Sequence, residues 1–371
     1  MKKFKIRMFI VLTSIQGMQF ISPCIAAEDA FIISQQRYFH ISPIFQSWAA
    51  DQGETISEFS TLAIFYFPLN DRMGMSVMSS QAMVSSDIST KLSGLTDTQV
   101  NMNYYSEKIS TLVSLGVNLP TGKKMLTANQ FTTSYLISLK QYNFRVPNFG
   151  QGLNISPGLS WAYPVRETFV IGIGISYQYR GPFTPFESMT GQYDPGEEIL
   201  ITGGADLRIS ETATCAADIV YTSYGKDKLD GQETFQSGNK FVTTVQLKIN
   251  AGYNEFRLLG CYRTKDKNQI AIAGGFLPDE QKTIPDQLDI LGQYRFRWGQ
   301  GHYTSLIGEM RFYNKTSIWG KTNILTLGVA PEFTLSPRVR MPVRLKYSIG
   351  NIDNGSKLSG IEIGLGLRFA F

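Results

Sequence analysis

Apolar and polar residues alternate with a period of two along most of the chain, from about residue 35 to its end. The last segment, IEIGLGLRFAF (361–371), places Ile361 and Ile363 on one face and Glu362 and Arg368 on the other. Such alternation is typical of a β-strand with one apolar face, and hardly any helical period interrupts it. The clearest predicted strands are 62–69, 110–119, 168–179, 198–209, 246–253, 256–263, 287–298, 304–313, 324–335 and 339–349.

The predicted strands are long, and their connections alternate in length. Segments of about 10–14 residues suit tilted membrane strands better than soluble ones. Short turns on one side and long loops on the other are the pattern of bacterial outer-membrane barrels. The short turns fall at 69–72, 209–212, 298–301 and 335–338, and the long loops at 82–96, 181–197, 225–240, 278–286, 315–322 and 351–357.

We therefore predict an all-β fold, an antiparallel transmembrane β-barrel of about 14–18 strands. Aromatic residues towards the strand ends and a final strand that ends in Phe371 favour it over the alternative, a soluble secreted β domain. One stretch breaks the parity, because three strands lie between the loops at 225–240 and 278–286, where an up-and-down barrel needs two or four.

The N-terminus has the features of an export signal. Lys2, Lys3, Lys5 and Arg7 precede a short apolar run, and Ala26 ends the segment with a small residue. We predict a signal peptide over 1–27 and a barrel over 28–371, preferring this to a membrane anchor, for which the apolar run is too short. A lipoprotein signal at Cys24 is a weaker alternative, because Pro23 stands where a small flexible residue is needed.

Charge and cysteine content narrow the class of protein. The chain has 35 basic and 30 acidic residues, but four of the basic ones lie in 1–27, so the rest is nearly neutral and no nucleic-acid partner is expected. Cys215 belongs to the outward set of its strand and Cys261 to the inward set, so we predict that they are not bonded to each other.

Charged side chains are expected to point into the lumen, since a basic residue at the lipid-facing midplane costs about 2–4 kcal/mol. Their opposite signs also allow ion pairs that close the lumen instead of lining an open one. The pore-lining candidates are Asp289, Arg295, Arg297, Glu309, Arg311, Arg340, Arg344, Lys346, Glu362 and Arg368.

Catalytic and metal chemistry find little support in the sequence. The chain has two histidines, His40 and His302, and neither has an acidic partner nearby in sequence. The glycine pairs of IGIGIS and IGLGLR lie within strands, with no helix after them to form a nucleotide loop. We expect no enzyme activity, no cofactor and no metal.

The long loop RGPFTPFESMTGQYDPGEE (180–198) is rich in aromatic residues and prolines. Phe183, Phe186 and Tyr193 could form a ligand entrance at the pore mouth. The alternative is a loop that folds on itself and buries these rings against one another.

The run GLTDTQVNMNYY (94–105), followed by LVSLGVNLPTGKK (112–124), resembles an outer-membrane family named after the meta-pathway of phenol degradation. Gly94 and Asp97 in the first run, and Leu119 to Gly122 in the second, carry the resemblance. It covers about a third of the chain. It implies an outer-membrane channel or transporter for small molecules, hydrophobic or aromatic ones among them.

The expected function is therefore passage of a small-molecule solute across the bacterial outer membrane. A structural or adhesive surface barrel, acting through its long loops, is the alternative. Besides outer-membrane lipid, resemblance to other outer-membrane barrels implies a second partner, the barrel-assembly machinery. The expected assembly signal is formed by Phe369 and Phe371.

Overall fold

The computed structural model describes residues 36–51, 53–317, 319–353 and 355–371. The predicted signal peptide, 1–27, lies outside these residues. Within the described ranges, no helix has the length and apolar character needed to cross a membrane.

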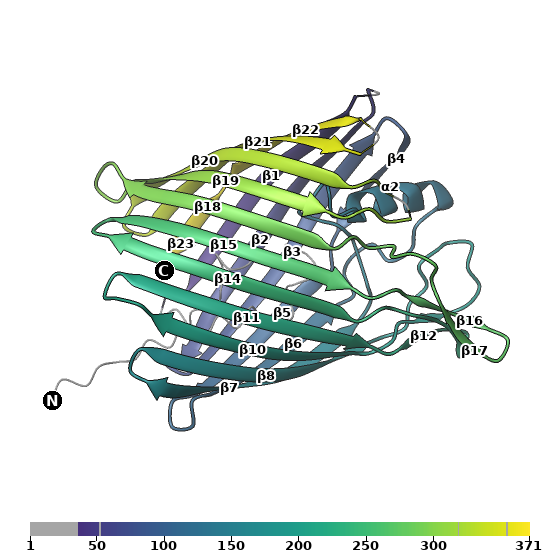
Figure 1. Cartoon of the computed structure of the whole chain (residues 1–371), viewed down its shortest axis with the longest axis horizontal. Coiled ribbons are helices and arrows are strands. Elements are labelled where there is room, and N and C mark those ends of the chain that lie inside the picture. The colour runs from purple at the N-terminus through teal and green to yellow at the C-terminus, as the bar shows by residue number, and fades with distance from the viewer. Residues whose placement is uncertain (1–35, 52, 318, 354) are drawn as a thin grey trace.

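Antiparallel strands form one closed barrel (Figure 1). Its sheet contains 18 strand segments, and two pairs of segments are halves of one interrupted strand, so the barrel has 16 strands, as the predicted range allowed. In chain order the segments are β1 (Tyr38–Ala50), β2 (Thr55–Asn70), β3 (Met73–Ser86), β4 (Ser89–Leu95), β5 (Thr98–Ser106), β6 (Thr111–Leu119), β7 (Asn154–Arg166), β8 (Phe169–Arg180), β10 (Glu198–Arg208), β11 (Ala213–Tyr224), β14 (Lys240–Ala251), β15 (Asn254–Lys265), β18 (Gln287–Arg297), β19 (Tyr303–Tyr313), β20 (Thr322–Ser336), β21 (Val339–Ile352), β22 (Lys357–Leu365) and β23 (Leu367–Ala370).

The barrel closes because the last strand pairs with the first. β1 pairs with β22, where Gln46 lies opposite Glu362, and with β23, where Phe39 lies opposite Phe369. β22 and β23 are one strand broken at Gly366, and β4 and β5 both pair with β3 and are likewise two halves of one strand. Closure leaves no unpaired edge, which a membrane-spanning sheet requires.

Turn length separates the two ends of the barrel. Tight turns such as 71–72, 167–168 and 337–338 lie at the end where the chain terminates, and the longest loops lie at the opposite end (Figure 1). Outer-membrane barrels have short periplasmic turns and long extracellular loops. The right-hand end in Figure 1 is therefore the extracellular one.

A second, five-stranded sheet stands beyond the extracellular end and is built from three loops. It resolves the parity problem of the sequence, because the third apolar run, 269–278, is a hairpin of this sheet and does not cross the membrane. A period of two marks a strand whether or not that strand crosses a bilayer, so alternation alone could not distinguish this hairpin from a pair of membrane strands. Its strands are β9 (Tyr193–Asp194), β12 (Lys226–Leu229), β13 (Gln232–Gln236), β16 (Gln269–Ile272) and β17 (Gly275–Pro278).

The prediction of a long loop at 82–96 was wrong. This stretch forms the hairpin of β3 and β4 with a tight turn at 87–88. Its serine-rich sequence lacks the dense apolar face of the other strands, which is why it was taken for a loop. Val84 and Leu92 lie opposite each other on the inner face of this hairpin and are completely buried.

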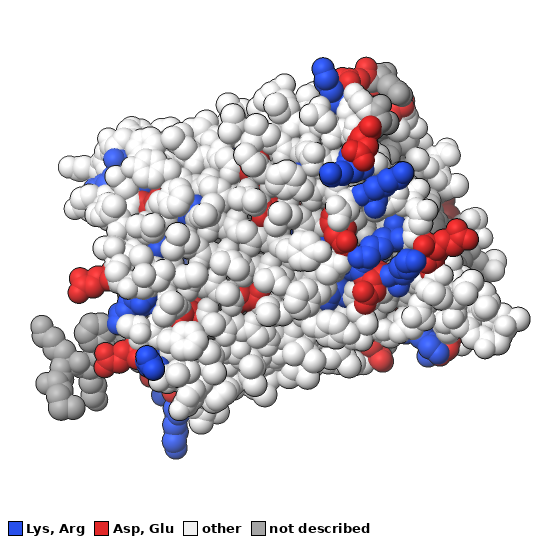
Figure 2. All heavy atoms as spheres, viewed as in Figure 1, with Lys and Arg blue, Asp and Glu red and all other residues white. Residues whose placement is uncertain are grey.

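The outer surface carries the apolar half of each strand. Large apolar side chains such as Leu306, Met310 and Leu345 are exposed on it, as expected for contact with lipid. Figure 2 shows charged side chains gathered near the ends of the visible face, with few between them. Cys215 is a free thiol, which confirms that it is not bonded to Cys261.

The C-terminal phenylalanines lie at the periplasmic end of the closing strand. Phe369 stacks on Phe39 of β1, with ring centroids 6.3 Å apart. The backbone N–H of Phe371 donates to the carbonyl of Arg37 at 3.0 Å, while its side chain stays exposed. The ring of Phe371 thus stays accessible at the periplasmic end of the barrel.

Deleting Phe371 should lower the amount of folded barrel in the outer membrane several-fold, if its exposed ring serves as the assembly signal. Heat-modifiable gel mobility of membrane fractions measures this amount. The control is Phe312→Ala, which removes another lipid-facing ring from a barrel strand. Equal losses in the two variants would mean that Phe371 contributes only apolar surface.

Candidate functional site: the barrel lumen

One long loop folds into the barrel. Residues 120–153, called here the internal loop, connect β6 to β7 and contain the helix α2 (Ala128–Ser138). A capping box formed by Thr127 and Gln130 begins this helix. The hydroxyl of Thr133 donates to the carbonyl of Thr90 at 2.5 Å and so fixes α2 to β4.

The internal loop packs on apolar side chains that point inward. Trp48, Val84, Ile324 and Leu358, on β1, β3, β20 and β22, form one buried cluster with its residues. Inward apolar residues would be unfavourable in a water-filled lumen, so their presence in one sector of the barrel is explained by the cover that the loop provides. The loop contributes Ile137, Tyr142, Phe144, Val146 and Phe149 to this cluster.

Polar side chains of the wall hold the backbone of the internal loop. The fully buried carboxylate of Glu58 on β2 accepts the N–H of Val146 at 3.1 Å. The side chain of Gln46 on β1 accepts the N–H of Arg145 at 2.8 Å. On β19, Arg311 donates to the carbonyl of Gln141 at 3.1 Å. The loop is therefore attached along the wall from β19 across the seam to β2.

Both roots of the internal loop meet at Asp97, in the gap between β4 and β5. Its buried carboxylate accepts the N–H of Gly122 at 2.9 Å, the N–H of Gln151 at 2.7 Å and the side-chain amide of Asn118 at 3.0 Å. Gly122 has to be glycine, because a Cβ there would lie 2.6 Å from the backbone nitrogen of Asp97. The residues that carry the family resemblance thus build the anchor of this loop.

The wall opposite the internal loop combines polar and apolar inward residues and is uneven in charge. Leu200, Val220, Val242 and Leu259, on β10, β11, β14 and β15, form a second buried cluster there. Small uncharged residues such as Ser114, Ser156 and Ser176 face inward on β6, β7 and β8. From β14 to β23, described inward positions carry an excess of bases over acids. The bases are Lys240, Lys248, Arg257, Arg263, Lys265, Arg295, Arg297, Arg311, Arg340, Arg344, Lys346 and Arg368, and the acids are Glu255, Asp289, Glu309, Glu332 and Glu362.

All ten residues proposed from the sequence as pore-lining point inward on this wall, and five of them belong to two groups of ion pairs. Near the periplasmic end, Glu332 binds Arg340 at 3.2 Å and Arg295 at 3.5 Å. Nearer the middle, Glu362 binds Arg344 at 3.6 Å and lies 4.0 Å from Lys346.

The remaining proposed residues have other neighbours. Glu309 and Arg311 pair at 3.6 Å, and Asp289 accepts two hydrogen bonds from the amide of Gln287. The guanidinium of Arg368 lies 4.2 Å above the ring of Tyr38.

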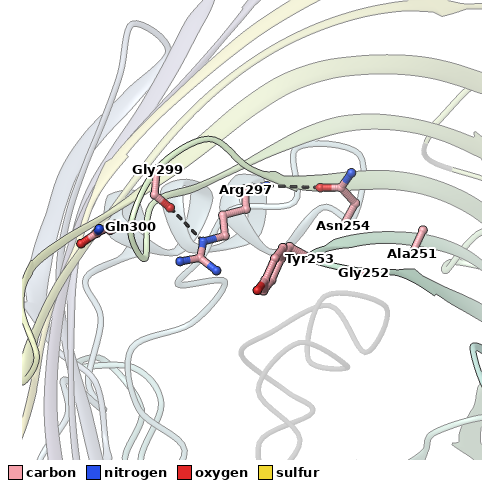
Figure 3. Close-up of a pocket in the computed structure, with 7 residues that line it drawn as sticks. All are labelled: Ala251, Gly252, Tyr253, Asn254, Arg297, Gly299 and Gln300. Atoms are coloured by element: carbon pink, nitrogen blue, oxygen red, sulfur yellow. Dashed lines mark hydrogen bonds between the residues drawn. The ribbon is translucent and has the colours of Figure 1, made fainter.

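Arg297, also proposed from the sequence, lines a cavity of about 790 Å³ at the periplasmic mouth (Figure 3). Its guanidinium stacks 4.5 Å from the ring centroid of Tyr253, and its Nε donates to the carbonyl of Gly299 at 2.8 Å. Tyr253 is highly exposed in the turn between β14 and β15. These contacts fix the direction of Arg297 and leave its terminal nitrogens toward the cavity, as Figure 3 shows.

The aromatic rings of the loop 181–197 pack on one another and on α2. Phe183 and Tyr193 meet edge to face at 5.6 Å and exchange two backbone hydrogen bonds. Phe186 packs edge to face on Phe131 of α2 at 5.1 Å. The hydroxyl of Tyr193 donates to Asp227 of β12, and this burial and bond raise its pKa. These rings join the external sheet to the internal loop.

The two histidines have aromatic, backbone and basic neighbours among the described residues. His302 stacks on Trp298 at 5.0 Å, and its Nδ1 accepts the N–H of Thr334 at 3.1 Å. His40 lies opposite Arg368 across the seam. In the described part of the chain, no three His, Cys, Asp or Glu side chains gather as metal ligands.

Several charged lumen residues were missed from the sequence. Lys240, Lys248 and Lys265 lie on inward positions of β14 and β15 and were not proposed as pore-lining. The alternation of residues did indicate these positions. Lys240 and Lys248 fall on the same face of their strand as polar residues, while Phe241 and Leu247 fall on the other face. Lys140 and Arg145 could not have been found this way, since a loop carries no period.

The sequence matches no protein-family model and no curated protein. Among solved structures, Pseudomonas aeruginosa OpdL is similar over 91% of this chain and 99% of its own, with 10% identity and a TM-score of 0.49. P. aeruginosa OprD is similar over 90% of this chain and 95% of its own, with 8% identity and a TM-score of 0.44. An outer-membrane channel from Pseudomonas putida F1 is similar over 91% of this chain and 95% of its own, with 7% identity and a TM-score of 0.38.

Proposed function

We propose that the protein is a passive outer-membrane channel for small solutes. The observation that carries this proposal is the one-sided attachment of the internal loop. Its described anchors lie on β1, β2, β4 and β19, and its apolar cluster adds β3, β20 and β22. The path would run between the loop and the wall formed by β6 to β18.

Side chains at the periplasmic end of that wall support a hydrated path there, whereas Val242, Leu259 and Arg263 further up the wall are buried. Lys248, Glu255 and Arg295 all point inward, yet 27%, 20% and 35% of their side-chain surfaces stay accessible. Charged groups keep such accessibility only where water reaches them. The inward arginines, lysines and acids proposed from the sequence would then line or border the path, and the basic excess would favour anions over cations.

Hydrophobic or aromatic solutes are the finer possibility that the family resemblance implies. An aromatic entrance formed by Phe183, Phe186 and Tyr193 has less support, because these rings pack on one another and on α2. The charged wall instead suits aromatic molecules that carry an acid group. Aromatic acids would fit both the aromatic solutes that the resemblance implies and the basic wall of the lumen.

Reconstitution into planar bilayers tests the proposal. We expect stepwise conductance from the folded full-length protein, with a reversal potential in a KCl gradient that favours chloride. A folded barrel that gives no conductance steps would contradict the channel function. A preference for potassium would contradict the role given to the basic wall.

The external sheet supports a second candidate function, a surface barrel that binds other cells or molecules. Ile270, Ile272 and Leu277 of the β16–β17 hairpin are all more than half exposed beyond the membrane end of the barrel. Replacing 269–278 by a short glycine-serine turn should then abolish surface binding while conductance persists. Loss of neither property would leave the channel as the sole function.

A further inference from the structure

Four basic groups come together at the extracellular end of the lumen. Lys240 on β14 lies directly opposite Lys265 on β15, and Arg263 follows on the same inward face. Lys140 comes from the internal loop, and these three cations are the charges that act on it. Its backbone is held in place, because its carbonyl accepts the hydroxyl of Tyr313 at 2.9 Å. We call these four residues the upper basic cluster.

No carboxylate of the described residues forms an ion pair with the upper basic cluster, although the charge of Asp289 acts on Arg263 and that of Asp227 acts on Lys265. Elsewhere on the wall, lysines and arginines pair with Glu255, Glu332 or Glu362. In the cluster, Lys265 donates to the hydroxyl of Ser237 at 2.5 Å, a neutral acceptor that does not balance its charge. Glu198, the acid whose charge acts on both lysines, is already bound to Arg180 at 3.3 Å.

Arg263 has an unused donor. The residue is 8% exposed, and its Nη1 donates to the side-chain oxygen of Gln287 at 2.5 Å. Its Nη2 is buried and finds no hydrogen-bond partner in the described part of the chain. A buried guanidinium nitrogen without an acceptor is costly, and guanidinium groups pair best with carboxylates and phosphates. An acceptor of this kind is what the site lacks.

We propose that the upper basic cluster is a binding site for small anions bearing a carboxylate or phosphate group, which it captures from outside the cell. This proposal rests on the channel function and names its solute class. The ring of Tyr224 lies 5.3 Å from the ammonium of Lys265, and Val242 is the inward neighbour of Arg263. These two side chains give the apolar body of an organic acid a surface beside its charge. Because the cluster faces the lumen, phosphates of membrane lipid do not reach it.

The charge of the cluster depends on pH. The side chain of Lys140 is open to the lumen, yet the surrounding protein and the charges of Arg263, Lys240 and Lys265 lower its pKa to about 8. A lowered pKa means that the positive form is complete well below pH 8 and lost above it. Anion binding should therefore weaken as the pH rises from 7 to 9. In a Lys140→Met variant this part of the pH dependence should disappear.

The experiment uses the full-length protein with two probes, benzoate and inorganic phosphate. Calorimetry in detergent measures binding, and block of single-channel current measures the same site during conduction. Arg263→Gln and the double variant Lys240→Gln/Lys265→Gln should each raise the apparent Kd at least tenfold. The matched control is Lys248→Gln, on the same face of β14 but already paired with Glu255 at 2.7 Å, which should keep the wild-type Kd.

The outcomes separate this proposal from the channel function. Binding without conductance would contradict the channel and leave the anion site standing. Conductance without binding of either probe, or an unchanged Kd in both variants, would overturn the anion site. Tighter binding of benzoate would assign the cluster to organic acids, and tighter binding of phosphate would assign it to phosphates. Heat-modifiable gel mobility shows whether each variant is folded.

Discussion

Replacing Asp97 by alanine should release the internal loop and enlarge the conducting path. The carboxylate of Asp97 holds Gly122 and Gln151, one at each root of the loop, and Asn118 beside them. Hydrogen bonds to a charged group contribute about 1.5–3 kcal/mol each, and the donors left behind are partly buried. We expect single-channel conductance to rise by about half or more, with frequent fluctuations, and the thermal midpoint of unfolding to fall by several degrees.

A second aspartate in the chain provides the control for this variant. Asp87 lies in the extracellular turn between β3 and β4. Its carboxylate accepts the N–H of Thr55 at 3.1 Å and makes no hydrogen bond to the internal loop among the described residues. Asp87→Ala should leave conductance unchanged. If Asp97→Ala folds and conducts like the wild type, the loop does not limit the path.

Replacing Glu362 by glutamine should shift ion selectivity further toward anions. Glu362 balances Arg344 and Lys346 and accepts the side-chain amide of Gln46 at 3.2 Å across the seam. Glutamine keeps an acceptor for Gln46 but removes the negative charge, so two cations of the wall lose their counter-ion. We expect the reversal potential in a KCl gradient to move toward that of chloride, with a loss of stability of about 1–3 kcal/mol.

Glu332 provides the comparison for Glu362. It also binds two arginines, but at the periplasmic end, where the side chain of Arg340 is 54% exposed. Hydration and salt screen such a pair, so Glu332→Gln should change selectivity and stability less. Equal effects of the two variants would show that position along the lumen does not matter for selectivity.

The barrel was predictable because lipid excludes charge from one face of every strand. In 304–313, for example, Leu306 and Met310 turn outward while Glu309 and Arg311 turn inward, as period two requires. Exclusion of charge by lipid identifies only strands that cross the membrane and have a dense apolar face. The run 269–278 alternates equally well but pairs outside the bilayer, and the serine-rich strand β3 alternates too weakly to be recognised.

The internal loop was not predicted, although its traces are present in the strands. Trp48, Val84, Ile324 and Leu358 are apolar at positions where the lumen rule calls for polar residues. Each exception alone means little in the sequence, because alternation does not reveal that their strands lie in one sector of the barrel. Only strand register brings the four together and shows that something must cover them.

The attachment of the internal loop has a consequence for how the barrel assembles. Every other pairing of barrel strands joins neighbours in the chain, whereas the seam joins β1 to β22 across a sequence separation of 316 residues between Gln46 and Glu362. Closing so long a stretch carries a large entropic cost and is slow. Gln46 on one side of the seam is bonded both to the loop and to Glu362 on the other side. The internal loop is therefore bonded through Gln46 to the strand pair that closes the barrel, so the segment that fills part of the lumen also joins the two ends of the sheet.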